Sequence, residues 1–359
     1  MRAAVLSIPI SGIAMIVGAA IAYQATGGRS CARCHEIQPA VDLWNQSTHR
    51  SVPCAECHGG LFTFEFHFHW KNFRQLLRHL AGRVPQQIVL RERREIDRAM
   101  AACRRCHEQE YARWQAGPHS VTYRQIFLDE QHNRKRLLMD DCFRCHGMHY
   151  PGNIAALVTP VDTRGPWRLL DQEMENRPTI PCLACHEIHR RGQPMGPQRR
   201  PRRAGPQQEE FRPSLALFDR RTQTHFSVAS MPVPQVYDNG RPLVMSRDPR
   251  QALCYQCHAP LATAERASGD DRTCRGVHEG LSCLACHEAH GQDTRASCKN
   301  CHPRLSNCGL DVETMDTTFK DPASKHNIHF VQCSDCHPKG VPRRARGERG
   351  LAEARRALD

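Results

Sequence analysis

The chain has few large apolar side chains for its length. Among 359 residues, aromatic residues make up 6%, and the hydrophobic share of 40% includes alanine and 20 cysteines. An ordinary interior of two domains filled with leucine, isoleucine and phenylalanine is therefore not expected. Disorder of the whole chain is not expected either, because cysteine and histidine do not promote disorder. We expect a group other than side chains to fill much of the interior.

Only one uncharged stretch is long enough to span a bilayer. It runs from Ala4 to Tyr23 and follows Arg2. The short basic start places the N-terminus inside and the remaining chain outside the cytoplasm. A cleavable signal peptide is the alternative, because Ala20-Ile21-Ala22 resembles a cleavage site. Both interpretations export the chain, and we favour a retained anchor in the cytoplasmic membrane with the rest on the periplasmic side.

Eighteen of the 20 cysteines form nine C-x-x-C pairs, and histidine follows every pair directly. We number these motifs 1 to 9 in chain order. They are Cys31/Cys34/His35, Cys54/Cys57/His58, Cys103/Cys106/His107, Cys142/Cys145/His146, Cys182/Cys185/His186, Cys254/Cys257/His258, Cys283/Cys286/His287, Cys298/Cys301/His302 and Cys333/Cys336/His337.

C-x-x-C-H is the attachment signature of c-type haem. The two thiols reach the two vinyl groups of one porphyrin, and the adjacent imidazole binds the iron as its proximal ligand. A zinc site would tolerate any residue after the second cysteine, and a thioredoxin-like motif would occur once. We therefore expect nine covalently bound haem c groups, each holding one iron. The fold class that follows is mostly α and irregular, with short helices wrapped around a stacked haem chain plus one N-terminal transmembrane helix.

The basic balance of the chain is explained by the same cofactor. Lys and Arg number 50 against 37 Asp and Glu, a formal net charge of +13. Each haem brings two propionates, about −2, and a ferric iron on the porphyrin dianion adds about +1, so nine haems lower the net charge to roughly +4 when oxidised and roughly −5 when reduced. We therefore expect no nucleic-acid partner.

An Arg- and Pro-rich segment divides the motifs into five and four. Residues 190–213 have a composition that cannot build a core and is typical of a linker or surface loop. Its arginines either bind an acidic partner or anionic lipid, or are merely solvated. The expected organisation is an anchor or signal peptide over 1–28, a five-haem domain over 29–189, the linker over 190–213, a four-haem domain over 214–338 and a basic tail over 339–359.

The first half contains an internal repeat. The pattern CHE…W-x4-H…CxxCH occurs over residues 31–58 and again over 103–146, which favours a duplicated two-haem unit. Its tryptophans and histidines are Trp44 and His49 in the first copy and Trp114 and His119 in the second.

The stretch CARCHEIQPAVDLWNQSTHRSVPCAECH and the fourth motif, CFRCHGMHY, resemble the NapC/NirT/NrfH family of membrane-anchored multihaem cytochromes c. The resemblance covers roughly residues 1–150. It implies one N-terminal anchor, four haems in two pairs and a periplasmic domain that oxidises membrane quinol. The family commonly has methionine two residues after the first motif, where this chain has Ile37. The haem 1 coordination of relatives is therefore not carried over.

The second half resembles doubled-CxxCH cytochromes, because CLACHEAHGQDTRASCKNCH places two motifs only 15 residues apart. Three motifs carry another histidine three residues on, namely His149, His189 and His290. On a short helix this imidazole lies one turn from its own motif and cannot reach the far side of its own porphyrin. We expect it to bind the iron of a neighbouring haem.

Beyond the nine proximal histidines the chain has 13 others, enough for two imidazoles at every iron. Any one of them could instead have a surface or hydrogen-bonding role. Ligation by two histidines closes an iron to substrate and leaves electron transfer as its chemistry. The expected distal ligands are His49, His119, His149, His189, His225, His278, His290 and His329, with His132 and His326 as further candidates.

Two cysteines, Cys274 and Cys308, lie outside the motifs. Outside the cytoplasm a disulfide between them is the default, with free thiols or thiolate ligation as alternatives.

The segment Leu61–Leu80 is rich in aromatic and basic residues, and its second half has the apolar spacing of an amphipathic helix. Such a segment suits a membrane interface, although packing on haem 2 explains it nearly as well. In the related cytochromes the equivalent stretch lies near the quinol site. We therefore expect one of four residues to accept quinol protons: Glu65, His67, His69 or Lys71.

Taken together, the sequence predicts a nonahaem cytochrome that passes electrons from membrane quinol to an extracytoplasmic redox protein or respiratory-complex subunit. Membrane lipid is a further expected partner. One alternative is a multihaem reductase of a small nitrogen or sulfur compound at an open iron. The other is an electron-transfer subunit of a larger respiratory complex or of a cytochrome filament.

Overall fold

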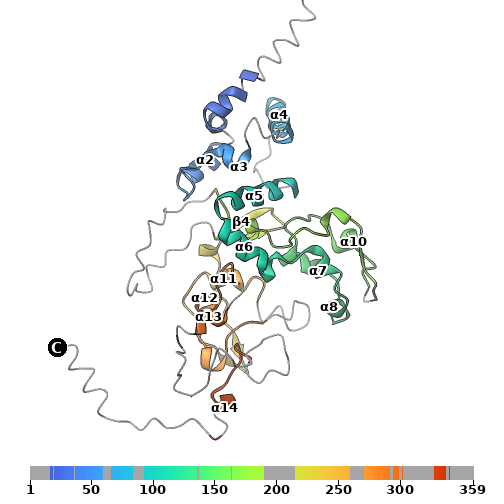
Figure 1. The fold of residues 1–359 in the computed structure, drawn as a ribbon, viewed down its shortest axis with the longest axis vertical. Helices are drawn as coiled ribbons and strands as arrows, with labels where there is room; N and C mark the ends of the chain where they lie inside the picture. Colours follow the sequence, from blue (N-terminus) through green and yellow to red (C-terminus); the bar gives the residue numbers. More distant parts are fainter. Residues whose placement is uncertain are drawn as a thin grey trace, which may run out of the picture. The chain divides into compact units, whose positions relative to one another are not determined.

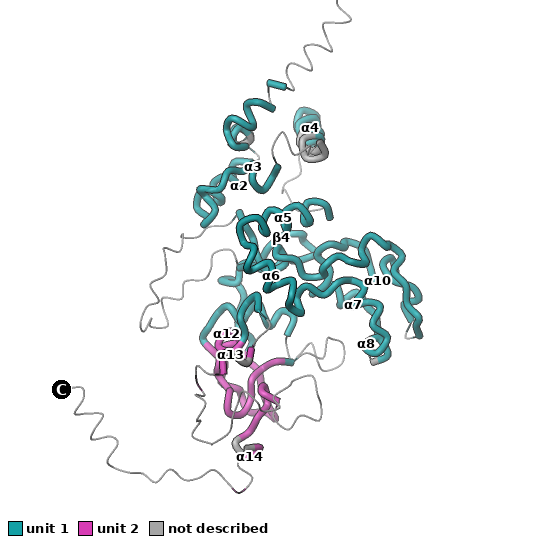
Figure 2. Tube along the Cα trace, viewed as in Figure 1, with its two compact units in different colours: residues 1–234, 247–271, 287–292 teal, residues 235–246, 272–286, 293–359 magenta. Residues whose placement is uncertain are grey.

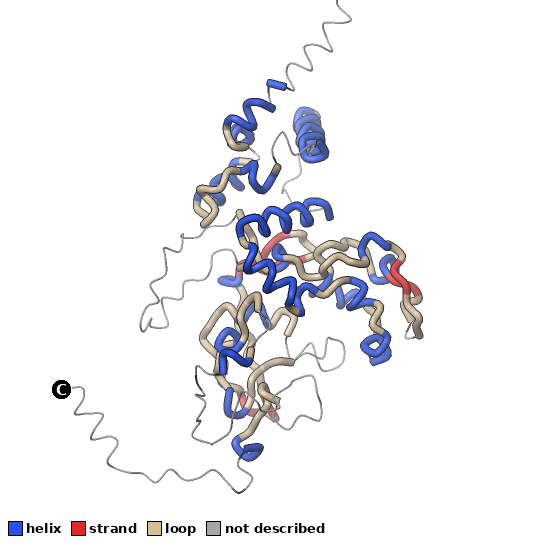
Figure 3. Tube along the Cα trace, in the orientation of Figure 1, coloured by secondary structure: helices blue, strands red, loops and turns tan. Residues whose placement is uncertain are grey.

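The computed structural model describes residues 17–18, 20–35, 37–59, 66–83, 93–135, 137–162, 164–189, 215–258, 271–291, 294–298, 301, 327–336 and 339. Over these residues the chain is mostly helical and irregular, and its strands form three separate two-stranded antiparallel sheets (Figure 3). The expected mostly α and irregular class is confirmed.

The chain divides into two compact units (Figure 2). Unit 1 comprises residues 1–234, 247–271 and 287–292, and unit 2 comprises 235–246, 272–286 and 293–359. Unit 1 therefore includes residues on both sides of the Arg- and Pro-rich segment 190–213, which itself lies outside the described residues.

Near the N-terminus, residues 20–25 are helical. Most of the expected anchor Ala4–Tyr23 lies outside the described residues. No helix in the described part of the chain is both long and apolar enough to cross a membrane.

Unit 1 carries most of the helices (Figure 1). Its α-helices are α2 (Gln38–Asn45), α3 (Cys54–His58), α4 (Phe66–Leu80), α5 (Arg93–Cys106), α6 (Glu108–Ala116), α7 (Tyr123–Phe127), α8 (Glu130–Lys135), α9 (Phe143–His146), α10 (Ile154–Leu157) and α11 (Gln251–Cys254). Its 3₁₀ turns are η1 (Arg29–Arg33), η3 (Pro118–Ser120), η4 (Asp140–Cys142), η5 (Gln172–Met174), η6 (Cys182–Ala184) and η7 (Val228–Ser230).

Local sequence explains several helix starts. Thr122 and Gln125 form a reciprocal capping box at the start of α7, which satisfies two backbone N–H groups. Asn153 caps α10 by accepting a hydrogen bond from the Ala156 N–H at 2.9 Å. These caps let helices of only four or five residues begin at defined positions.

Side chains do form a core in part of unit 1. One cluster of buried apolar residues contains Tyr123, Phe127, Leu138, Phe143, Tyr150, Ile154, Leu157, Val158, Trp167, Leu169 and Met174. A second cluster contains Ile96, Met100, Trp114, Met148, Leu183, Ala184 and Phe218. The low aromatic content led us to expect little side-chain core, and the structure differs because the available large residues are concentrated here.

Two hairpins complete unit 1. Strand β1 (Val158–Thr159) pairs with β2 (Arg168–Leu169), and β3 (Ala216–Asp219) pairs with β4 (Thr224–Ser227), with Ala216 opposite Ser227. The N–H of Ala216 donates to the Cys185 carbonyl at 3.0 Å. The chain after the Arg- and Pro-rich segment therefore packs directly against motif 5.

Unit 2 contains the hairpin β5 (Tyr237–Asp238) and β6 (Arg241–Pro242), the turn η9 (Gly276–His278), and the helices α12 (Cys283–Cys286), α13 (Arg295–Cys298) and α14 (Cys333–Cys336). The hairpin turn is Asn239-Gly240, and both residues have positive φ, as a type I′ turn requires.

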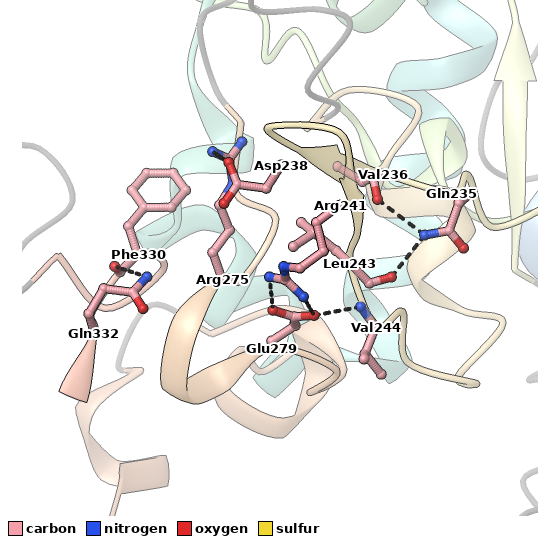
Figure 4. Close-up of polar contacts among 10 residues, drawn as sticks. All are labelled: Gln235, Val236, Asp238, Arg241, Leu243, Val244, Arg275, Glu279, Phe330 and Gln332. Carbon is pink, nitrogen blue, oxygen red and sulfur yellow. Dashed lines mark hydrogen bonds and ion pairs between the residues drawn. The ribbon is translucent and has the colours of Figure 1, made fainter. Parts of the chain in front are cut away.

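A carboxylate holds this hairpin. Glu279 accepts two hydrogen bonds from the Arg241 guanidinium, at 2.8 and 2.7 Å, and a third from the Val244 backbone N–H at 2.8 Å (Figure 4). Gln235 supports the same strand ends by donating to the Val236 and Leu243 carbonyls.

The segments that precede motifs 7 and 9 run together in unit 2. The Arg275 N–H donates to the His329 carbonyl at 2.7 Å, and the Val277 N–H donates to the Val331 carbonyl at 3.1 Å. Between them, Gly276 has a φ of +67°, and a Cβ there would lie 2.2 Å from the Val331 oxygen. Only glycine allows this close approach.

Candidate functional site

Most of the CxxCH motifs lie on helical turns. The cysteines of motif 2 open α3, those of motif 3 end α5, and motifs 4 to 9 each begin, end or coincide with a short helix or 3₁₀ turn where they are described. In motifs 3, 5 and 6 the histidine N–H donates to the carbonyl of the first cysteine, at 2.8 to 3.0 Å. A helical turn brings two cysteines three residues apart onto one face, as attachment to one porphyrin requires.

Four of the described motif cysteines are exposed, and the expectation that haem fills much of the interior stays a prediction. The exposed ones are Cys34, Cys57, Cys106 and Cys301. Cys34 directly follows η1, and Cys301 lies three residues beyond the end of α13. The Cys301 N–H still donates to the Cys298 carbonyl at 3.2 Å, so the two thiols of motif 8 stay on one turn.

Motif 7 is divided between the two compact units. Cys283 and Cys286 belong to unit 2, whereas His287 belongs to unit 1 together with His290. The expected four-haem domain over 214–338 therefore does not coincide with either unit. His287 is half-buried and lies just beyond the end of α12, not within the helix as the histidines of motifs 2 and 4 do. Its expected role as the proximal ligand of motif 7 stays a prediction.

Thiols of different motifs lie against one another. The Cys103 thiol of motif 3 is hydrogen-bonded to Cys182 of motif 5, and this bond together with burial raises the pKa of Cys103. The Cys257 thiol of motif 6 is likewise hydrogen-bonded to Cys145 of motif 4, and its pKa is raised by that bond and by burial. Motifs 3 and 5, and motifs 4 and 6, therefore adjoin within unit 1.

Motif histidines lie beside non-motif histidines. Five of the motif histidines in the described part of the chain are paired in this way, and each of these pairs lies in unit 1. The pairs and their ring-centroid distances are His35 with His79 (5.3 Å), His58 with His189 (5.9 Å), His107 with His49 (6.1 Å), His186 with His290 (5.9 Å) and His258 with His119 (6.3 Å).

These distances are close to the separation of two imidazoles around one metal ion. An imidazole nitrogen binds a transition metal at about 2.0 Å, and the centroid of the five-membered ring lies about 1.1 Å behind it, so two opposed rings have centroids roughly 6 Å apart. Among the described residues, no group of three or more His, Cys, Asp or Glu side chains gathers as a metal cluster. Pairs of imidazoles suit haem, because the porphyrin supplies the other four nitrogen ligands.

The internal repeat presents two of these histidines in the same way. Trp44 and Trp114 are both buried at the ends of their helices, α2 and α6. In each copy a tight turn follows, so that His49 reaches the histidine of motif 3 and His119 reaches that of motif 6.

The histidines three residues beyond a motif also reach other motifs. His189, which follows motif 5, lies beside His58 of motif 2, and His290, which follows motif 7, lies beside His186 of motif 5. In both cases the neighbouring ring belongs to a different motif from the one that the histidine follows. The third, His149, belongs to a cavity described below.

Burial favours the neutral form of three of the paired imidazoles, His189, His49 and His58. It lowers the pKa of His189 to about 4, with a further contribution from His58. Burial is also the larger cause of the lowered pKa of His49, ahead of His107, and it lowers the pKa of His58. A neutral imidazole is the form that binds a metal, so protons do not compete for these nitrogens near neutral pH.

His149 tests whether the structure fits a haem. Its side chain is fully buried, and within the described residues neither ring nitrogen makes a hydrogen bond. It lines a cavity of about 480 Å³ together with Trp114, Tyr111 and Met100, and burial lowers its pKa to about 4. Asp97, Arg104, Arg105 and Glu108 also line the cavity, and Asp97 Oδ1 lies 4.0 Å from His149 Nδ1. A buried neutral imidazole beside a cavity with apolar and charged walls fits a haem, whose macrocycle is apolar and whose propionates are charged.

Hydrogen bonds select the ligating nitrogen of other histidines. The buried Thr179 hydroxyl donates to the Val121 carbonyl at 3.1 Å, so at its 2.9 Å contact with His146 it accepts from Nδ1–H. This leaves Nε2 of His146, the motif 4 histidine, to bind a metal. His278 donates from Nδ1 to the Ile328 carbonyl at 3.1 Å, with the same result.

His225 has the opposite arrangement. Its Nε2 lies 2.7 Å from the Leu183 carbonyl, which can only accept, so Nε2 carries the proton. Only Nδ1 then remains to bind a metal, and this placement does not favour the expected role of His225 as a distal ligand. His329, another distal candidate, is buried beside Phe330.

Several predicted residues lie outside the described part of the chain. These are Glu65, His302, Cys308, His326 and His337, together with the side chains of Cys31, His67, His69, Lys71, His132, Cys333 and Cys336. The sequence did not single out His79 or Thr179. His79 is far from any motif in sequence, and Thr179 is recognisable only from its contact with His146.

Comparison with known families matches residues 102–187 to the family described as cytochrome c554 and c-prime. The matched segment contains motifs 3, 4 and 5. The match supports the chain being a c-type cytochrome. The chain is therefore a haem-based electron-transfer protein with covalently bound haem c. This c-type cytochrome matches no curated protein and no solved structure. The matched family is not NapC/NirT/NrfH, so that resemblance and its membrane anchor stay predictions.

Proposed function

We propose that this c-type cytochrome holds nine haems and passes electrons from membrane quinol to an extracytoplasmic redox partner. The partner is an extracytoplasmic redox protein or a subunit of a respiratory complex. The single observation that carries the proposal is the set of five imidazole pairs, each joining a motif histidine to a non-motif histidine.

When bound, each haem supplies an iron that alternates between ferric and ferrous states and so carries one electron. The cysteines of the nine motifs would hold the porphyrins, and the nine motif histidines would be the proximal ligands. The distal ligands supported by the ring pairs are His189 for motif 2, His49 for motif 3, His290 for motif 5 and His119 for motif 6.

This ligand pattern favours electron transfer over catalysis. An iron with an imidazole on both sides has no position at which a small nitrogen or sulfur compound could bind. Each pair also joins distant parts of the sequence, for example His119 and His258. Such long-range pairs would hold the irons at fixed distances from one another. Electron transfer between haems requires fixed distances and no open coordination position.

The quinol and membrane parts of the proposal are supported by α4. Trp70, Phe73, Leu76, Leu77 and Leu80 on this helix are all exposed, between 48% and 74%. The exposed basic residues Arg74 and Arg78 lie beside them. An apolar helix surface with basic flanks suits the interface of a membrane with anionic lipids. Glu65, His67, His69 and Lys71, at the start of this segment, are the proposed proton acceptors for quinol.

The haem count and ligation can be tested together. A pyridine haemochrome assay and intact-protein mass on the full-length protein should both give nine haems per chain, and a lower number would overturn the nonahaem proposal. EPR of His189→Ala should show one new high-spin haem per chain, because His58 loses its opposing imidazole. His225→Ala is the matched control and should keep the wild-type spectrum.

The quinol step needs a separate test. In proteoliposomes, alanine at Glu65, His67, His69 or Lys71 should slow quinol-driven haem reduction while leaving reduction by dithionite unchanged. Arg168→Ala, an exposed change on β2, is the control. Unchanged quinol-driven rates in all four variants would exclude this segment as the quinol site and leave the haem assignments standing.

A further inference from the structure

The sequence alone does not identify a distal ligand for motif 1. Ile37 occupies the position where a methionine ligand would be expected from the family resemblance. His49, the next histidine along the chain, lies beside His107 of motif 3. The structure instead places the ring of His79, from the last turn of α4, 5.3 Å from the ring of His35.

We propose that His79 is the sixth ligand of the iron at motif 1, opposite His35. This inference rests on the proposed haem ligation, and it adds a binding residue that links α4 to motif 1. The contact has the same form as the other four pairs, because it joins one motif histidine to one non-motif histidine. Its centroid distance is slightly shorter than the roughly 6 Å expected around a metal, so the rings would separate by less than 1 Å on binding.

The position of His79 on α4 agrees with a ligand role. Phe73, Leu76, Leu77 and Leu80 are exposed, whereas Gln75 and His79 are only partly exposed. Residues four apart lie on one helix face, so Gln75 and His79 mark the face that α4 turns towards the rest of the chain. The Nδ1 atom of His79 is itself buried.

The end of α4 fixes the backbone at His79. Gly82, with a φ of +67°, donates its N–H to the His79 carbonyl at 2.9 Å, and the Arg83 N–H donates to the Arg78 carbonyl at 2.8 Å. These two bonds form a Schellman motif, which terminates the helix at a defined residue. The imidazole is therefore presented from a closed helix end.

Other histidines of the same helix cannot replace His79 in this place. His69 lies ten residues earlier, so it is about 15 Å away along the helix axis. Bringing it to His35 would require α4 to slide by nearly three turns. The proposal therefore predicts that one histidine of α4, and not its neighbours, controls the spin state of haem 1.

The test is EPR and magnetic circular dichroism of full-length, haem-loaded variants. His79→Ala should convert one haem per chain from low-spin to high-spin, and added imidazole should restore the low-spin signal. His79→Met should stay low-spin with a changed signature and a higher reduction potential, because thioether replaces imidazole. Gln75→Ala, on the same helix face, should keep the wild-type haem spectrum.

The outcomes separate this inference from the function on which it depends. A wild-type spectrum for His79→Ala, with nine haems retained, would overturn the assignment of His79 alone. If His290→Ala also failed to produce a high-spin haem, the ligation pattern of the proposed function would fall as well. A high-spin signal in His79→Ala that imidazole could not restore would indicate a packing defect and would also count against direct ligation.

Discussion

Residues 20–83 and residues 123–174 both belong to unit 1 and both carry CxxCH motifs, yet their interiors differ. Residues 123–174 contain the cluster of 11 buried apolar side chains, among them Tyr123, Phe127 and Phe143 with no exposed surface. In the described part of residues 20–83, the buried side chains are Tyr23, Trp44 and Ser47. Residues 123–174 therefore have ordinary side-chain packing, whereas the described part of residues 20–83 has few buried side chains.

The difference indicates two ways of holding a haem motif. In residues 20–83 polar contacts join separate segments, such as the Tyr23 hydroxyl donating to the Gly59 carbonyl at 2.8 Å and the Ala55 N–H donating to the Gly27 carbonyl at 3.1 Å. Hydrogen bonds of this kind contribute only about 0.5–1.5 kcal/mol each. The apolar surface needed to stabilise this region is thus expected from the porphyrins themselves.

The largest expected effect is therefore that of removing haem. In a chain produced without haem attachment, residues 20–83 should lose their protection against amide exchange, because their apolar contacts are missing. Residues 123–174 should keep partial protection, because their core is made of side chains. Hydrogen exchange followed by mass spectrometry distinguishes the two regions within one sample. Equal loss of protection in both regions would remove the contrast.

The side-chain core can be weakened without touching a haem ligand. Phe127→Ala should destabilise the haem-loaded protein by about 3–5 kcal/mol, because a fully buried phenylalanine leaves a cavity. Phe226→Ala on β4, where the ring is 46% exposed, should change the stability by no more than about 0.5 kcal/mol. Guanidinium unfolding followed by tryptophan fluorescence measures both. Similar losses in the two variants would mean that residues 123–174 are also held mainly by haem.

The contrast also shows what the sequence could predict. The motifs identify the cofactor because two thiols and an imidazole at fixed spacing have one chemical use. The H-x-x-H reasoning for His189 and His290 uses only the geometry of a helical turn, so it too is accessible from sequence. The dipeptide Asn239-Gly240 is a strong sequence signal for a hairpin turn, although our sequence analysis did not use it.

Other features depend on contacts between distant residues. Nothing in the sequence relates His79 to His35, because the two are 44 positions apart and meet only when α4 folds back. The assignment of Nε2 in His225 to a hydrogen bond with Leu183 depends on the β3–β4 hairpin packing beside motif 5. The concentration of aromatic side chains in residues 123–174 is hidden by a low overall aromatic content.

A glycine near motif 2 tests how residues 20–83 are held. Gly28 has a φ of +88°, and a Cβ there would lie 2.8 Å from the Cys54 Cβ. Gly28→Ala should cost more than the roughly 1–2 kcal/mol of a left-handed alanine, because it also displaces a haem-attaching cysteine. Gly82→Ala has a similar backbone but meets nothing within 4 Å, so it should show the conformational cost alone. Thermal unfolding and the haem content compare them, and equal effects would argue against close packing at Cys54.

The smallest expected effect is that of protonating or replacing Glu279 in unit 2. Its carboxylate accepts hydrogen bonds from Arg241 and from the Val244 N–H beside the β5–β6 hairpin. The hydrogen bonds from Arg241 and from the Val244 N–H lower the pKa of Glu279 from 4.5 to about 2. Because the folded form has the lower pKa, the unfolded form takes up a proton first as the pH falls. The stabilisation should be complete above about pH 4.5 and should disappear as the pH approaches 2. The protection of the Val244 amide, which is its exchange rate relative to the intrinsic rate at the same pH, should therefore fall over this range in the wild type. Glu279→Gln should show lower protection of this amide at neutral pH and no further loss on acidification. A wild-type pH profile of protection in this variant would mean that Glu279 does not stabilise the hairpin.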